Sequence, residues 1–203
     1  MSSAADHEAV EPESFEFNAE SLERAKVILA RYPEERRQSA VMPLLDLAQR
    51  QYGWLPKTVI AYVADMCGMP FVRAYEVATF YTMYKLKPVG KYHLQLCRTT
   101  PCWLRGAGDM RDVVREKLGI SHDEVTDDGK FSLEEVECLG GCVNAPIIQV
   151  NDDYYEDLDR ERAEKLLDSL SRDEVPEHGP TVDRQTSAPE TDRKTLLNEG
   201  EGA

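Results

Sequence analysis

The chain has 203 residues, of which 41% are hydrophobic and 31% charged, so it holds enough apolar material for a core together with some solvated polypeptide. Its 24 Lys and Arg residues against 38 Asp and Glu residues give a net charge of -14, and so acidic a surface repels phosphate backbones and anionic lipids. We therefore expect no nucleic-acid partner, and no direct membrane insertion, because no apolar run approaches the roughly 18 residues of a transmembrane helix.

The two ends of the chain have the composition of disordered tails. Residues 1–17 carry acidic side chains but no Lys or Arg, which fits neither a secretory signal nor an organellar transit peptide. Residues 172–203 are rich in Pro, Gly, Ser, Thr and acidic residues and show no periodic apolar face. The predicted segments are a disordered acidic tail over 1–17, a helical bundle over 18–79, an α/β domain over 80–171 and a disordered tail over 172–203.

Residues 19–80 show the periodicity of packed helices. Apolar side chains recur every three to four positions, for example from Leu22 to Tyr32. Gly53 is suited to end the second helix, and Pro56 to begin the third. The predicted helices span, in order, residues 22–32, 41–52, 56–67 and 71–78. Their apolar stripes are expected to pack together as the core of a small bundle.

The pattern changes after Thr79, where strands and helices begin to alternate. In the strand over 131–137, the alternation of residues expected to face inward shifts by one position, which suggests a bulge near Glu134 and Glu135. The predicted elements are strands over 79–84 and 92–96, a helix over 104–118, strands over 131–137 and 147–150, and a helix over 159–170. The fold class is therefore α+β, with an N-terminal helical bundle followed by a small α/β domain.

Four of the five cysteines form two pairs, and each pair follows a predicted strand. The spacing is C-x4-C in one pair and C-x3-C in the other, and the residues are Cys97, Cys102, Cys138 and Cys142. Two loops at the same end of a sheet can bring four thiolates around one centre. An odd number of cysteines argues against a disulfide framework and favours a metal or redox role in a reducing compartment. The fifth, Cys67, lies on an apolar helical stripe and is expected to be a buried, inert thiol.

On spacing alone, three interpretations of the cysteine pairs stay open. A 2Fe–2S cluster is favoured, because its wide core is commonly held by longer loops such as C-x4-C. A structural zinc site usually uses C-x2-C knuckles, although longer spacings occur, and the third interpretation is that no metal binds. The four histidines form no Rieske motif, and the C-x-x-C of thioredoxin-type redox chemistry is absent.

Several other residues near the pairs have competing interpretations. Arg98 and Arg105 flank the first cysteine loop and either provide counter-charge or face solvent. Trp103 either shields the site from water or fills the core. His93 falls on the opposite strand face from its apolar neighbours, so we expect it to face solvent or a partner. The acidic run over 152–159 lacks the EF-hand spacing and is expected to be a solvated helix start.

Three runs of residues resemble a known family, the thioredoxin-like 2Fe–2S ferredoxins that form the E subunit of NADH-quinone oxidoreductase, respiratory complex I. The runs are Glu-Val-Ala-Thr-Phe-Tyr-Thr-Met-Tyr at 76–84, Cys-Arg-Thr-Thr-Pro-Cys at 97–102 and Glu-Val-Glu-Cys-Leu-Gly-Gly-Cys-Val-Asn-Ala-Pro at 135–146. The resemblance covers about residues 18–170. It implies a thioredoxin-like fold for residues 80–171 and one 2Fe–2S cluster, whose ligands would be Cys97, Cys102, Cys138 and Cys142.

The same resemblance implies a function and partners. The chain would exchange electrons with the flavin (FMN) and NADH-binding subunit, against which the helical bundle would dock, beside other peripheral-arm subunits of complex I. It would be part of an enzyme without a catalytic base or nucleophile of its own, and cytoplasmic, peripheral to the inner membrane through the complex. The alternatives are the equivalent subunit of an NAD-linked formate dehydrogenase or hydrogenase, and a zinc-stabilised interaction module without redox function.

Overall fold

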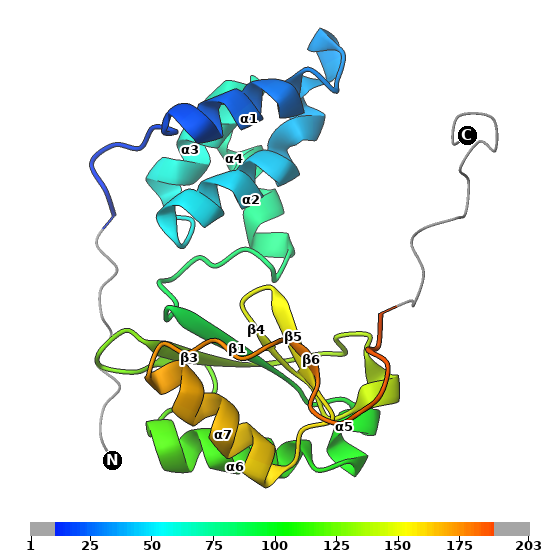
Figure 1. Cartoon of the computed structure of the whole chain (residues 1–203). Helices are drawn as coiled ribbons and strands as arrows, with labels where there is room; N and C mark the ends of the chain where they lie inside the picture. The colour runs from blue at the N-terminus through cyan, green and yellow to red at the C-terminus, as the bar shows by residue number, and fades with distance from the viewer. Residues whose placement is uncertain (1–10, 189–203) are drawn as a thin grey trace, which may run out of the picture. The chain divides into compact units, whose positions relative to one another are not determined.

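The computed structural model describes residues 11–188 and divides the chain into two compact units, residues 1–89 and 90–203 (Figure 1). The first unit is helical and the second combines a mixed sheet with helices, which confirms the α+β fold class. The first unit extends past the predicted end at residue 79, because the turn after the last helix still packs on it. Tyr84 is buried and donates its hydroxyl to the carbonyl oxygen of Met42 at 2.9 Å.

The helical unit contains the four predicted helices and a short 3-10 segment. Its elements are α1 (Ala19–Leu29), η1 (Glu34–Ala40), α2 (Val41–Tyr52), α3 (Lys57–Cys67) and α4 (Phe71–Phe80). Gly53 ends α2 in the left-handed conformation, as predicted. The predicted strand over 79–84 is wrong, because α4 continues through Phe80 and a turn follows. Of the aromatic residues that suggested a strand, Tyr84 lies in the core of the helical unit, whereas Phe80 and Tyr81 are exposed.

Residues 11–17 pack against the helices, contrary to the predicted disordered tail. Phe15 and Phe17 are 9% and 7% exposed and lie edge-on to each other and to Tyr62. The carboxylate of Glu11 accepts hydrogen bonds from the first two backbone N–H groups of α3 at 3.1 and 3.3 Å, where a helix has free donors. Two aromatic side chains therefore anchor an otherwise acidic and largely exposed segment to the helices.

The second unit is built on a mixed sheet in the strand order β2-β3-β1-β4-β5-β6. Its elements are β1 (Tyr92–Cys97), α5 (Thr100–Leu104), α6 (Ala107–Leu118), β2 (Glu124–Val125), β3 (Phe131–Val136), η2 (Cys142–Asn144), β4 (Ile148–Val150), β5 (Asp153–Glu156), α7 (Arg160–Ser171) and β6 (Gly179–Pro180). Strands β1 and β3 run parallel, and β4 pairs antiparallel with β1 on its other side. Helices α6 and α7 lie together on one face of the sheet and close its apolar core (Figure 1).

Three details of this unit differ from the prediction. The expected helix over 104–118 begins only at Ala107, because Gly106 has a φ of 101° that breaks the helical path, and the separate short helix α5 precedes it. The bulge expected near Glu134 is absent, since β1 and β3 pair residue by residue from Tyr92 with Phe131 to Cys97 with Val136. Strands β2, β5 and β6 were not predicted, because they are short or polar.

Residues 172–188 also contact the folded unit, although they were predicted to be disordered. The Tyr155 hydroxyl donates to the carbonyl oxygen of Pro176 at 3.0 Å, and β6 pairs in parallel with β5. The Asp173 carboxylate accepts hydrogen bonds from Lys91 at 2.8 Å and Lys130 at 3.1 Å. Because these contacts are largely polar, the sequence of this segment shows no apolar periodicity that would have predicted them. The predictions for residues 1–10 and 189–203 lie outside the described residues.

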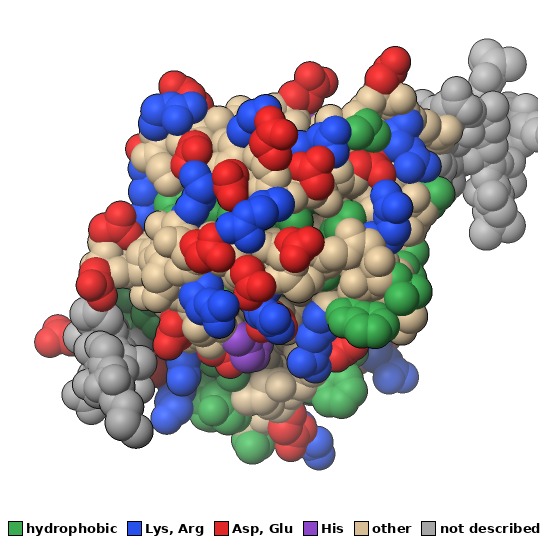
Figure 2. Space-filling model, turned by 90° about the horizontal axis from the view of Figure 1, so that it is seen from below, with side chains coloured by type: hydrophobic (Ala, Val, Ile, Leu, Met, Phe, Trp, Pro, Cys, Tyr) green, Lys and Arg blue, Asp and Glu red, His purple; other side chains and the backbone are tan. Residues whose placement is uncertain are grey.

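Acidic and basic side chains are interspersed on the face of the second unit that carries α6 and α7 (Figure 2). Ion pairs join the two helices there, between Lys117 and Asp168 at 2.6 Å and between Glu116 and Arg160. Such a face offers no continuous basic surface to a phosphate backbone. Within the part of the chain that the structure describes, no helix is both long and apolar enough to cross a membrane.

Candidate metal centre

The two cysteine pairs lie at the same end of the sheet, as their positions after two strands predicted. Cys97 is the last residue of β1, and Cys102 lies in the short helix α5 that follows. Cys138 and Cys142 lie in the loop after β3, and Cys142 begins η2. Because β1 and β3 are parallel neighbours, with Cys97 opposite Val136, their carboxyl ends deliver both loops to the same place.

The two pairs differ in their exposure to solvent. Cys97 and Cys102 are 1% and 0% exposed, whereas Cys138 and Cys142 are exposed. The sulfur atoms of Cys138 and Cys142 are 3.4 Å apart, and the Gly140 N–H donates to the Cys138 sulfur at 3.3 Å. All five cysteines are free thiols. The centre therefore has one buried and one exposed half.

Within the buried pair the two thiols have opposite pKa shifts. Burial raises the pKa of Cys97, but hydrogen bonds from the Thr99 hydroxyl and from the backbone N–H groups of Leu139 and Thr99 outweigh it and lower the pKa overall. The Leu139 N–H belongs to the second loop, so the two loops meet at Cys97. Burial raises the pKa of Cys102 to about 12, and its hydrogen bond to Cys97 acts in the same direction.

The exposed pair repeats this arrangement. The Gly140 N–H, followed by the thiol of Cys142, lowers the pKa of Cys138. The hydrogen bond to Cys138, followed by burial, raises the pKa of Cys142. Each pair thus combines one thiol whose pKa is lowered with one whose pKa is raised. A metal ion is bound by thiolates, so its binding would release the thiol protons.

The donor set fits two metal ions, each held by one pair. Among residues 11–188, no group of three or more His, Cys, Asp or Glu side chains is arranged to hold a metal ion, and the cysteines come together two by two. A 2Fe–2S cluster takes four thiolates, two at each iron, which corresponds to two separate pairs. The loop of the exposed pair also needs glycine, because Gly140 has a φ of 87° and a Cβ on Gly141 would lie 2.4 Å from Ile147 Cδ1.

The structure distinguishes between the competing interpretations of several residues near the cysteine pairs. Arg98 forms an exposed ion pair with Glu137 at 3.0 Å, and Arg105 is exposed, so both face solvent. Trp103 is 67% exposed and does not fill the core. Cys67 is 1% exposed, and burial raises its pKa to about 11, which confirms the expected buried thiol.

His93 is buried, so the prediction of a solvent-facing or partner-facing histidine is wrong. Its ring lies between two side chains of β3, with Nδ1 2.8 Å from the Ser132 hydroxyl and Nε2 3.0 Å from the Glu134 carboxylate. The strand register places Ser132 directly beside it. The second face of the sheet is thus polar at this point, and the His93 ring is largely covered there, which strand periodicity does not reveal.

The acidic run over 152–159 is only partly a solvated helix start. Asp159 caps α7 by accepting from the Arg162 N–H at 2.8 Å, as a helix start requires. Glu156, by contrast, is 2% exposed and accepts a hydrogen bond from the Asn144 side chain at 2.6 Å. Sequence reasoning missed both residues of this contact. In the sequence, the only indication of this contact was that Asn144 lies two positions after Cys142, a predicted ligand.

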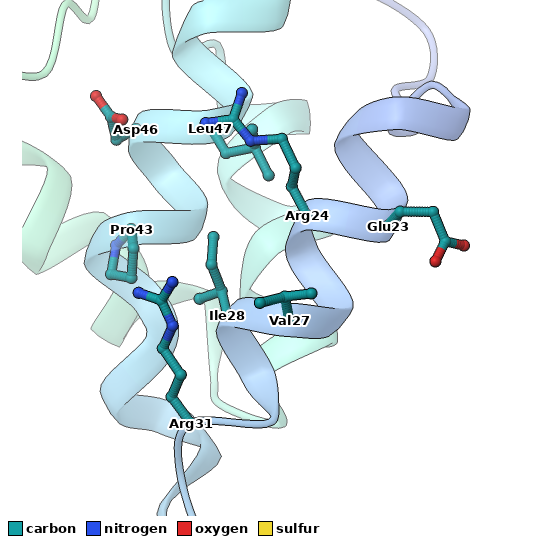
Figure 3. A pocket seen from close by; sticks show the side chains of 8 residues that line it. All are labelled: Glu23, Arg24, Val27, Ile28, Arg31, Pro43, Asp46 and Leu47. Atoms are coloured by element: carbon teal, nitrogen blue, oxygen red, sulfur yellow. The ribbon is translucent and has the colours of Figure 1, made fainter. Parts of the chain in front are cut away.

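A groove on the helical unit lies between α1 and α2 (Figure 3). It is lined by Glu23, Arg24, Val27, Ile28, Arg31, Pro43, Asp46 and Leu47. Arg24 extends from α1, Arg31 lies in the turn after it, and Asp46 lies on α2 (Figure 3). The groove contains none of the predicted site residues, and its mixture of opposite charges and aliphatic side chains suggests no particular chemistry.

Comparisons with known proteins agree with this centre. Residues 25–171 match the family described as thioredoxin-like [2Fe-2S] ferredoxin. A protein of Rickettsia bellii (strain RML369-C), named as the E subunit of NADH-quinone oxidoreductase, is 60% identical over 161 residues, which cover 79% of this chain and 96% of that protein. The protein of the same name from Rickettsia conorii (strain ATCC VR-613 / Malish 7) is 56% identical over the same shares of both chains.

Among solved structures, the NAD+-reducing [NiFe]-hydrogenase in its H2-reduced state matches with a TM-score of 0.58 and 18% identity. The match covers 66% of this chain but only 22% of the hydrogenase chain, and it shows a shared fold alone. The family match and the relatives confirm the predicted 2Fe–2S cofactor. The chain belongs to the thioredoxin-like [2Fe-2S] ferredoxin family, together with these two NADH-quinone oxidoreductase proteins.

Proposed function

We propose that this chain is the 2Fe–2S electron-transfer subunit of an NADH-quinone oxidoreductase and exchanges electrons with the FMN and NADH-binding subunit. The observation that carries the proposal is that four free thiols lie in two pairs at the carboxyl ends of β1 and β3, with one pair buried and the other exposed. The 60% identity to a protein named as part of that complex supports the choice of complex.

The four paired cysteines are the proposed ligands of one cluster. Cys97 and Cys102 would hold the inner iron, and Cys138 and Cys142 the outer iron. When bound, the cluster supplies a carrier for one electron. The protein keeps one side of the centre dry and leaves the other accessible, so a redox partner approaches from the loop of the exposed pair.

Exposed apolar side chains next to the cysteines are the proposed contact with the flavin subunit. Trp103, Leu104 and Val143 are 67%, 69% and 68% exposed and lie in α5 and η2, the two elements that carry Cys102 and Cys142. Large apolar side chains left exposed together commonly mark a protein interface. A partner that covers them would also exclude water from the exposed pair.

The helical unit presents a second apolar surface, for which we propose docking to the same complex. Val72 and Phe80 on α4 and Met83 after it are 57%, 75% and 49% exposed. Phe71 stacks on Tyr75 at 5.5 Å on the same helix. The flavin subunit and other peripheral-arm subunits are the proposed partners of this surface. We place the complex in the cytoplasm, peripheral to the inner membrane, which the five free cysteines support.

The equivalent subunit of an NAD-linked hydrogenase or formate dehydrogenase is the second candidate. The fold shared with an NAD+-reducing hydrogenase favours it, although at 18% identity that likeness concerns the fold only. In both candidates the chain carries a 2Fe–2S cluster beside a subunit that handles NADH. The zinc-stabilised module is not retained, because the chain belongs to a 2Fe–2S family.

Reduction by NADH in a reconstituted pair tests the proposal. The full chain, loaded with iron and sulfide under anaerobic conditions, is mixed with the purified flavin subunit and NADH, and the EPR signal of the reduced cluster is recorded. We expect a signal only when the flavin subunit and NADH are both present. A chain that binds no iron, or whose signal is independent of the flavin subunit, would contradict the proposed function.

A further inference from the structure

We infer that residues 178–188 form a strap that holds the exposed cysteine loop in place through the buried carboxylate of Glu156. Figure 1 shows this last described part of the chain, in orange to red, beside β5. The strap lies beyond residue 171, where the family match ends, so it is an addition to the matched domain. Its role toward the cluster rests on the ligands proposed above.

The Glu156 side chain is the centre of the contact. It ends β5 and is 2% exposed, and a buried carboxylate is stable only when hydrogen-bond donors surround it. Asn144 Nδ2 donates to Oε2 at 2.6 Å, and the Ser187 N–H donates to the same oxygen at 3.0 Å. The Ser187 hydroxyl donates to the other oxygen, Oε1. One donor therefore comes from the cysteine loop and two come from the strap.

Asn144 connects this carboxylate to the metal ligands. It is the last residue of η2, the turn that Cys142 begins, and its backbone N–H donates to the Gly141 carbonyl oxygen at 3.0 Å. Its side chain also donates to the Gln185 carbonyl oxygen in the strap at 2.8 Å. The turn that carries Cys142 is thus fixed from Glu156 on one side and from the strap on the other.

The strap also touches the cysteine loop directly. A Cβ on Gly141 would lie 2.9 Å from the Ser187 hydroxyl and 3.2 Å from the Ser187 Cβ. Only a residue without a side chain lets the Ser187 side chain approach the loop backbone this closely. Gly141 immediately precedes Cys142, so Ser187 covers the loop next to one of the proposed iron ligands.

The other end of the strap is anchored at the end of β5. The Thr181 N–H and hydroxyl both donate to the Glu156 carbonyl oxygen, at 3.0 and 2.9 Å. Arg184 forms an ion pair with Asp157 at 3.2 Å. The apolar core of the unit is built from residues 92–170. The strap is consequently attached by polar contacts to a core that is complete without it, and it can be removed separately.

Glu156 is therefore a positioning residue, which acts on the centre through Asn144 and Ser187. Without the strap, its carboxylate keeps the Asn144 donor but loses both donors from Ser187. The turn at Cys142 then loses its outer cover, and water and chelators reach the exposed half of the centre more easily. We expect faster loss of iron and greater backbone motion confined to residues 140–146.

Two truncations of the full chain test this role. A chain that ends at residue 188 keeps the strap and serves as the matched control, whereas a chain that ends at residue 177 lacks it. Iron release from the loaded protein into an excess of a coloured iron chelator should be about tenfold faster for the shorter chain and unchanged for the control. Hydrogen exchange should rise at residues 140–146 and stay unchanged in α6.

Point variants decide the outcome even if the shorter chain folds poorly. Ser187→Ala removes one donor to Glu156 and should release iron about threefold faster. Thr186→Ala removes a hydroxyl from an exposed neighbour that makes none of these contacts, and it should behave as the wild type. Glu156→Gln, which replaces an accepting oxygen with an N–H2 group, should reproduce the effect of the shorter chain and alter the EPR line shape.

Three results would overturn the inference. One is an unchanged release rate and unchanged exchange after the strap is removed. Another is a uniform rise in exchange across the whole unit, because the strap would then be a general stabiliser. The third is an equal effect of Ser187→Ala and Thr186→Ala. If the wild-type chain itself bound no iron, the proposed function would fail, but hydrogen exchange in the cluster-free protein would still test the strap.

Discussion

Adding one methyl group at Gly141 tests how closely the cysteine loop is packed. The residue has a φ of -91°, which alanine adopts freely, so Gly141→Ala causes no backbone strain. Its Cβ would instead lie 2.4 Å from Ile147 Cδ1, and Ile147 is 1% exposed and cannot turn into solvent. Overpacking of this kind costs about 1–3 kcal/mol, and the lower chain entropy of alanine offsets about 0.4–1 kcal/mol. We expect a net loss of about 1–2 kcal/mol in the free energy of unfolding.

Urea unfolding of the cluster-free chain, followed by circular dichroism, measures this loss, and iron content after reconstitution measures its effect on the centre. Ile147→Val removes the Cδ1 atom, the nearest one that the new methyl group meets, leaves the Ser187 hydroxyl at 2.9 Å, and by itself costs about 0.5–1.5 kcal/mol. The double variant Gly141→Ala with Ile147→Val should therefore be more stable than the sum of the single effects predicts. Gly108→Ala in α6, where a Cβ meets open space, is the control and should stabilise the chain by about 0.5–1 kcal/mol. Simple additivity in the double variant, or a fully stable Gly141→Ala, would refute the described packing.

Three further predictions concern the ligands, the N-terminal segment and an ion pair. Serine substitution of each of the four paired cysteines should lower bound iron or change the EPR signal, whereas Cys67→Ser should leave the spectrum unchanged; the reverse pattern would disprove the ligand assignment. Phe15→Ala should cost about 3 kcal/mol of stability in urea unfolding, whereas the exposed Phe80→Ala should cost almost none but weaken binding to the flavin subunit in a pull-down. Hydrogen bonds, first from Lys91 and then from Lys130, lower the pKa of Asp173 from 3.8 to about 2, so its contribution to stability is present above about pH 4 and is lost as the pH falls towards 2. Stability measured across that range should fall less for Asp173→Asn than for the wild type, and parallel curves would contradict the pairing.

The elements with a clear apolar period were predicted correctly. The stripe from Val41 to Tyr52 became α2, and the alternation of Tyr92, Leu94 and Leu96 became β1, because those side chains form the two cores. The cysteine pairs were located by the same reasoning, since each follows a strand that the sequence shows. The local pattern was misleading at 79–84, where the residues typical of a strand end α4 and form a turn, and Tyr84 joins the helical core.

The parts of the centre that the sequence did not reveal depend on contacts between distant residues. Glu156 lies in an acidic run, and only its placement opposite Asn144 and Ser187 shows that it is buried. His93 is buried for a similar reason, because its hydrogen-bond partners belong to β3. The residues of the strap carry no periodic signal, since the contacts described for them are polar and do not build an apolar face.

The two outer strands of the described sheet affect how copies of the chain meet one another. Both β2 and β6 are only two residues long, and β6 contains Pro180, which has no N–H to donate. Short edges that contain proline offer few free backbone groups to a strand from another molecule, which protects a sheet from aggregation. A proteolytic cut ahead of β6 would leave the four-residue β5 as the edge. Loss of β6 would therefore present a longer edge, with more free backbone groups, to a second copy of the chain.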